Sequence, residues 1–224
     1  MKPEQVEFIF DNYKLIENKL VIFLETIPFS KENEKVWSPE LVSLFVETGN
    51  LLDSLSRNLL GGSERLNIVD FENDLFKINS LLSINIIIYT YPLRVLTPFE
   101  NYRTNEDGWW HIYNKLKHNR IDNYEKANLV NIINALGCLF LLLTRYKEEE
   151  FSKALHRRQW IKTNIVPEYV HTERNGTNFV PFWCDSSLFG GSDNPTLIPK
   201  ELEKINPVMT STKFQRYFGR YNPQ

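Results

Sequence analysis

Residues 129–143 read LVNIINALGCLFLLL, and no polar side chain interrupts the run from 135 to 143. A helix needs about 20 apolar residues to cross a bilayer, so this stretch is too short to do so. It predicts a buried helix instead, and a helix that is apolar nearly all round lies at the centre of a bundle. We expect it to form part of one long helix from about Tyr124 to Arg157, in a mainly α-helical fold.

Amphipathic helices are predicted on the N-terminal side of this core. Apolar residues recur at helical spacing over residues 3–27, as on a helix that buries one face. A second helix is predicted over residues 38–60, with Ser38 as its cap and proline at its first position. The pair Gly61-Gly62 favours a left-handed turn after it. Asp70 is expected to cap a third helix that runs to about residue 80.

Residues 84–91 have a different texture, because β-branched and aromatic side chains dominate and Pro92 follows. This pattern predicts a short strand, paired with residues 95–97 in a hairpin. The alternative is that the preceding helix continues. A short helix is predicted next, over residues 109–120.

The overall composition is that of a folded globular protein. The 224 residues carry 26 Lys and Arg against 28 Asp and Glu, a net charge of −2, which excludes a strongly basic tail and a polyacidic disordered chain. Aromatic residues make up 13% of the chain, enough to anchor a packed core. The first 80 residues hold 8 cations and 14 anions, so the remainder is mildly basic and compatible with a phosphate-bearing partner.

The cysteines and histidines point away from disulfide and metal sites. Two cysteines, Cys138 and Cys184, do not make a disulfide framework, and four scattered histidines add no familiar zinc spacing. We therefore expect no metal and no cofactor. Because no secretory signal or membrane span is visible, we expect a cytoplasmic protein without membrane contact.

The chain divides into two predicted parts. Residues 1–160 should form the helical bundle. Residues 161–224 lose the helical period and contain scattered prolines and aromatics, which predicts a loop-rich extension packed on the bundle, with a short strand near 179–183.

Residues 109–120, WWHIYNKLKHNR, form the one chemically suggestive segment: two histidines, three cations and no acid. At helical spacing, one face carries apolar side chains and the opposite face carries His111, Asn114 and His118. The apolar face consists of Trp109, Ile112, Tyr113 and Leu116. Asn114 and His118 are four residues apart, so their side chains could touch. Trp109 and Trp110 are either core residues, which we favour for Trp109, or stacking platforms for bases.

The polar face could support RNA cleavage without a metal. His118 would act as general acid or base, since histidine exchanges protons near neutral pH. Asn114 would orient the imidazole or a ribose hydroxyl. The phosphate would contact Arg120, Lys117 and Lys115, with His111 beside them. The alternative is a solvated polar face with no chemistry.

Three stretches carry a resemblance to known proteins: PF at 98–99, WWxxYNxxKHxR at 109–120 and ANLxNxxxAL at 127–136. They resemble a set of uncharacterised bacterial helical proteins that are in turn similar to the HEPN superfamily. Membership would imply a helical bundle, commonly dimeric. Many such proteins are metal-independent ribonucleases of toxin–antitoxin and phage-defence systems.

The HEPN motif is arginine, a polar residue, three variable residues and histidine. Asn114 matches the polar position and His118 the histidine, whereas Tyr113 stands where the family has arginine. Arg120 or Lys117 would have to replace that arginine. The resemblance therefore leaves three functions open: a ribonuclease acting on RNA as a homodimer, a non-catalytic module that binds RNA or a protein partner, and a structural helical scaffold.

Overall fold

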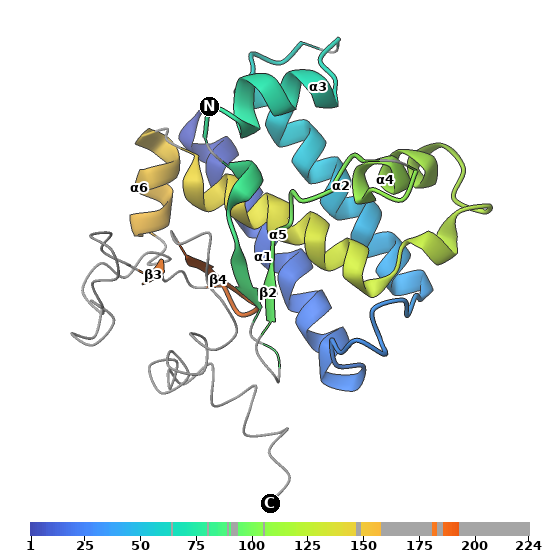
Figure 1. The fold of residues 1–224 in the computed structure, drawn as a ribbon. Helices are drawn as coiled ribbons and strands as arrows, with labels where there is room; N and C mark the ends of the chain where they lie inside the picture. Colours follow the sequence, from blue (N-terminus) through green and yellow to red (C-terminus); the bar gives the residue numbers. More distant parts are fainter. Residues whose placement is uncertain are drawn as a thin grey trace, which may run out of the picture.

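The structure is a computed structural model that describes residues 1–63, 65–79, 81–88, 90, 94–104, 106–146, 149–157, 181–182 and 186–192. Across these residues the fold is mainly α-helical, with six α-helices and a small antiparallel sheet (Figure 1). Most of the predicted extension 161–224, including Cys184, lies outside the described residues.

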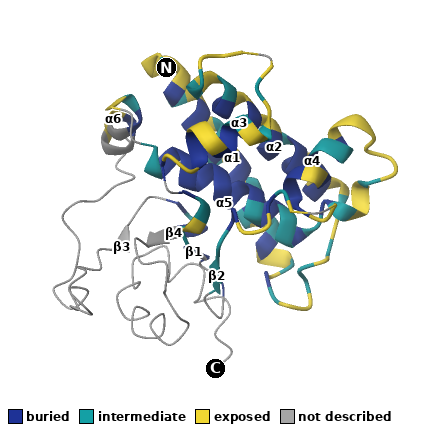
Figure 2. Cartoon of the chain, turned by 45° about the horizontal axis from the view of Figure 1, so that its top comes forward, coloured by how far each residue is buried: buried dark blue, intermediate teal, exposed yellow. Residues whose placement is uncertain are grey.

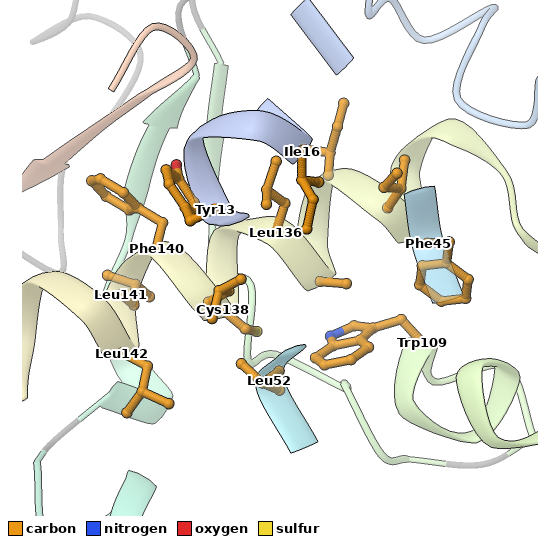
Figure 3. Close-up of a cluster of buried hydrophobic side chains, with 14 of the residues drawn as sticks. Tyr13, Ile16, Phe45, Leu52, Trp109, Leu136, Cys138, Phe140, Leu141 and Leu142 are labelled. Carbon is orange, nitrogen blue, oxygen red and sulfur yellow. The ribbon is translucent and has the colours of Figure 1, made fainter. Parts of the chain in front are cut away.

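The apolar helix is the centre of the fold, as its sequence predicts. It forms α5 (Leu129–Arg145), which packs against α1 (Pro3–Thr26) and α2 (Pro39–Leu59) (Figure 1). Figure 3 shows side chains from α1, α2 and α5 meeting in one cluster, among them Tyr13 and Leu136. None of the helices described is long and apolar enough to span a bilayer.

The predicted starts and ends of the first two helices are confirmed. Ser38 caps α2 by accepting a hydrogen bond of 3.1 Å from the N–H of Leu41. After α2, Gly61 and Gly62 adopt φ values of +91° and +79°, which glycine tolerates best. Asp70 does not start the third helix as predicted: Asn67 caps the short helix α3 (Ile68–Phe71), and Asp70 completes the capping box by accepting from the N–H of Asn67 at 2.7 Å. A π-helical turn, η1 (Glu72–Phe76), follows.

The prediction of a single long helix over residues 124–157 is also wrong, because the helix is interrupted at two places. A 3₁₀ turn, η3 (Tyr124–Lys126), precedes α5, and the side chain of Asn128 caps α5 by accepting from the N–H of Asn131 at 3.2 Å. Tyr146 then leaves the helix in extended geometry, and α6 (Glu149–Arg157) starts separately. A side-chain cap inside an apolar pattern is easily missed, since asparagine also occurs within helices.

The predicted hairpin is confirmed in a shorter form, after a 3₁₀ turn, η2 (Leu81–Ser83). Strand β1 (Ile86–Ile88) pairs antiparallel with β2 (Arg94–Leu96), which rules out a continued helix. On its other side β1 pairs with β4 (Phe189–Ser192). The far edge of β4 pairs with β3 (Pro181–Phe182), which completes the sheet. Gly137 of α5 makes room for this sheet, because a Cβ there would lie 2.6 Å from Cδ1 of Ile86.

A buried carboxylate ties the two ends of the described chain together. Glu17 of α1 is fully buried, and its Oε1 accepts from the N–H of Ser187 at 3.1 Å and of Leu188 at 3.3 Å. The hydroxyl of Ser186 donates to the same oxygen, and Lys14 pairs with Oε2 at 2.6 Å. The segment before β4 is therefore anchored directly on α1.

Candidate functional site

The suggestive segment forms α4 (Trp109–His118), two residues shorter than predicted. Its start is fixed against the preceding loop by a hydrogen bond of 2.9 Å from the N–H of Trp110 to the carbonyl of Tyr102. Gly108 permits this approach, because a Cβ there would lie 2.7 Å from the same carbonyl oxygen. The orientation of α4 is therefore set before its polar face begins.

The predicted apolar face of α4 is confirmed as buried, and Trp110 joins it. Trp109 is 3% exposed and donates from Nε1 to the carbonyl of Pro98 at 3.2 Å, while Trp110 is 5% exposed and packs edge-on against Phe71. Neither tryptophan can act as a stacking platform for bases. Figure 3 places Trp109 beside the α5 cluster.

Tyr113 points into the core. It is fully buried, and its hydroxyl donates to Oδ1 of Asn50 at 2.8 Å. Gly49 makes room for the ring, since a Cβ there would lie 2.2 Å from a ring carbon. Burial, with the negative charge of Asp53, raises the pKa of the phenol well above its usual value. Tyr113 is thus a packing residue.

Two of the predicted polar residues are bound to backbone. Nε2 of His111 lies 2.9 Å from the carbonyl oxygen of Arg103, and Nδ2 of Asn114 donates to the carbonyl of Trp110 at 3.0 Å. Within the described ranges no hydrogen bond joins Asn114 to His118. The structure therefore does not bring together the pair that the helical spacing suggested.

The two lysines of α4 face carboxylates from other segments. Nζ of Lys115 lies 3.1 Å from Oε2 of Glu106, and this contact lowers the pKa of Glu106. Nζ of Lys117 lies 3.6 Å from Oδ2 of Asp53 and 5.6 Å from the centre of the Tyr113 ring. Both ammonium groups are partly exposed, so they can still face a ligand while part of their charge is balanced.

His118 and Arg120 differ from the rest of the segment. Both are exposed, and the side chain of neither forms a hydrogen bond or ion pair within the part of the chain that the structure describes. They flank Asn119, where α4 gives way to a compact turn closed by a hydrogen bond of 3.3 Å from the N–H of Asn123 to the carbonyl of Arg120. The imidazole of His118 and the guanidinium of Arg120 thus lie exposed at the C-terminal end of α4 and just beyond it. Figure 2 shows exposed segments, in yellow, next to α4.

Glu72, which the sequence pattern did not reveal, holds the loop that precedes α4. Its Oε2 accepts from the hydroxyl of Tyr102 at 2.7 Å and from Nε of Arg103, and Lys77 lies 3.0 Å from Oε1. The hydrogen bond from Arg103 is the main cause that lowers the pKa of Glu72 to about 2. Glu72 fixes the loop whose Arg103 carbonyl lies against His111.

The described residues contain no group of three or more His, Cys, Asp or Glu side chains arranged to hold a metal ion. Comparison with protein-family models, with curated proteins and with solved structures finds no match to this chain.

Proposed function

We propose that this chain is a HEPN-like helical protein that binds RNA through the C-terminal end of α4. The observation that carries the proposal is that the exposed side chains of His118, at the end of α4, and of Arg120, two residues beyond it, have no partner among the described residues. The other polar side chains of α4 all have partners. An unpaired guanidinium binds a phosphate with two donors in a fixed geometry. Lys117 supports it, because its ammonium group is only partly offset by Asp53.

Cleavage of the bound RNA is the reaction that His118 would serve. The imidazole would take the proton of a 2′-hydroxyl while that oxygen attacks the adjacent phosphorus. The bond from phosphorus to the 5′-oxygen breaks, and the leaving oxygen takes a proton from solvent. The products are a 2′,3′-cyclic phosphate and a 5′-hydroxyl. Arg120 would stabilise the charge that develops on the phosphoryl oxygens.

The burial of Tyr113 favours a second candidate, a non-catalytic HEPN-like module that binds RNA or a protein partner. A residue that is fully buried and bonded to Asn50 cannot take the place of a motif arginine at a phosphate. In a ribonuclease, the missing positive charge would come from Arg120 or from a second copy of the chain. A homodimer in which two α4 ends face one cleft is the assembly that the ribonuclease requires.

The test compares the chain with two single variants, His118→Ala and Arg120→Ala, on a single-stranded oligoribonucleotide in the presence of a chelator. For a ribonuclease, His118→Ala should abolish the cyclic phosphate product while binding persists, and Arg120→Ala should weaken binding about tenfold. Ile78→Ala, at an exposed site elsewhere, is the matched control. Binding without any cleavage by the unmodified chain would favour the non-catalytic module, and absence of binding would refute the proposal.

A further inference from the structure

Two aromatic side chains lie exposed beside the end of α4, although they come from different parts of the chain. Trp37 is 41% exposed and Tyr124 is 38% exposed, and their ring centres are 4.6 Å apart. We call these two residues the aromatic pair. Large aromatic rings usually contribute to the core, as Trp109 and Trp110 do here, so an exposed pair in contact requires an explanation.

The aromatic pair is held rigidly by backbone contacts. Residues 34–37 run alongside the start of α5: the N–H of Leu129 donates to the carbonyl of Val36 at 2.9 Å, and Trp37 forms a β-bridge with Asn128. Tyr124 belongs to η3, which the N–H of Ala127 closes on the carbonyl of Tyr124 at 3.1 Å. The backbone that carries both rings is thus fixed by hydrogen bonds, and the rings contact each other, which reduces the entropy lost when a ligand binds.

Tyr124 of the aromatic pair lies close in the sequence to the cations of the candidate site. Tyr124 follows directly on the turn in which Asn123 donates to the carbonyl of Arg120. Over residues 117–126 the chain carries Lys117, Arg120 and Lys126 against Asp122 and Glu125, with His118 in addition. Asp122 already accepts a hydrogen bond from the side chain of Asn119. Cations next to rigid exposed rings form a surface that complements phosphates and the flat faces of bases.

We infer that the aromatic pair is a stacking platform for unpaired bases of a single-stranded RNA whose backbone lies along His118 and Arg120. This inference rests on the proposed function and deepens it by naming the substrate class. Bases within a duplex have no free face to offer, so a stacking platform selects single strands. Because rings stack on any base, the platform gives affinity and register without sequence preference.

The test measures binding by fluorescence anisotropy, with a labelled 2′-O-methyl oligouridine of about 12 nucleotides as the probe. The 2′-O-methyl groups prevent cleavage, so binding is measured alone. Trp37→Ala should weaken binding about tenfold, and Trp37→Phe should retain most of the affinity. Ile121→Ala is the matched control, since Ile121 is 82% exposed in the same turn but has no ring. Thermal melts confirm that each variant is folded.

The outcomes separate this inference from the proposed function. If Trp37→Ala binds the probe as tightly as the unmodified chain, or if a blunt duplex binds as well as the single strand, the stacking platform is refuted even where cleavage occurs. If Trp37→Ala weakens binding but an unmodified oligoribonucleotide is never cut, the ribonuclease is refuted and the platform stands. Association with proteins but not with the probe would also refute the platform.

Discussion

The buried and the exposed side of α4 differ in the contacts that their side chains make. On the buried side every large residue is explained by packing: Trp109 and Trp110 close the loop before the helix, and Tyr113 fits over Gly49. On the exposed side, the charged and amide side chains have hydrogen-bond or ion-pair partners almost to the end of the helix. Among the described residues, the side chains of His118 and Arg120 have no such partner.

This contrast separates three residues that one short motif groups together. The motif contains Tyr113, Asn114 and His118. In the structure, however, Tyr113 is buried in the core, and the side chain of Asn114 bonds to a backbone carbonyl of its own helix. Only the third remains available to a ligand. We therefore expect substitutions on the buried side of α4 to change stability and those on its exposed side to change ligand binding. The following substitutions test this difference, in order of expected effect.

The largest effect is expected from placing an arginine at the position of Tyr113. Tyr113→Arg would bury a guanidinium near Arg57 and Lys117, with Asp53 already engaged by both. It should lower the free energy of unfolding by about 3 kcal/mol or more and should not raise ribonuclease activity. Tyr113→Phe, which loses only the bond to Asn50, should cost about 1 kcal/mol. Urea denaturation checks both, and a stable, more active arginine variant would contradict the assignment of Tyr113 to the core.

The next largest effect is expected at the carboxylate of Glu72, which holds the loop before α4. The pKa of Glu72 is lowered to about 2 from an ordinary value of 4.5, so the ionised form stabilises the fold above pH 4.5. That stability is lost as the pH falls from about 4.5 to 2. Glu72→Gln should cost about 2 kcal/mol at neutral pH and flatten the acid limb of the stability curve. Equal acid limbs for the two proteins would show that Arg103 and Tyr102 do not hold this charge.

A smaller effect is expected where the two sides of α4 meet. Asp53→Asn removes a carboxylate that pairs with Arg57 at 3.0 Å and with Lys117 at 3.6 Å. It should reduce stability by about 1 kcal/mol and, by freeing Lys117, tighten RNA binding about threefold at low salt. Titration at two salt concentrations checks the electrostatic origin. Weaker binding would indicate that Asp53 positions Lys117 for the ligand.

The smallest effect is expected at Lys115. Its partner Glu106 is 85% exposed, and exposed ion pairs contribute little. Lys115→Ala should leave the melting temperature unchanged and alter RNA affinity less than twofold. A loss as large as that of Arg120→Ala would extend the contact surface toward the start of α4.

The sequence pattern predicts the helices wherever local signals dominate. Ser38 and the double glycine mark the limits of α2, and the apolar run marks α5. The signal fails at Asn67 and Asn128, because an asparagine cap resembles an ordinary polar residue until the chain around it is known.

The candidate site shows the same division. The buried face of α4 follows from the helical period alone. The partners of its polar face cannot be predicted, because Asp53 and Glu106 come from segments whose distance from α4 only the tertiary fold determines. Trp37 and Tyr124 are likewise 87 positions apart in the sequence, and no local pattern joins them.

The anchoring of Ser186–Leu188 on Glu17 has a consequence for the order in which the chain folds. Three donors to the Glu17 carboxylate lie 169 to 171 residues further along the chain. Lys14 and Tyr13, which lie on α1 itself, also contact that carboxylate. Contacts of such long range slow folding, so we expect Glu17 to be buried late, although α1 is synthesised first.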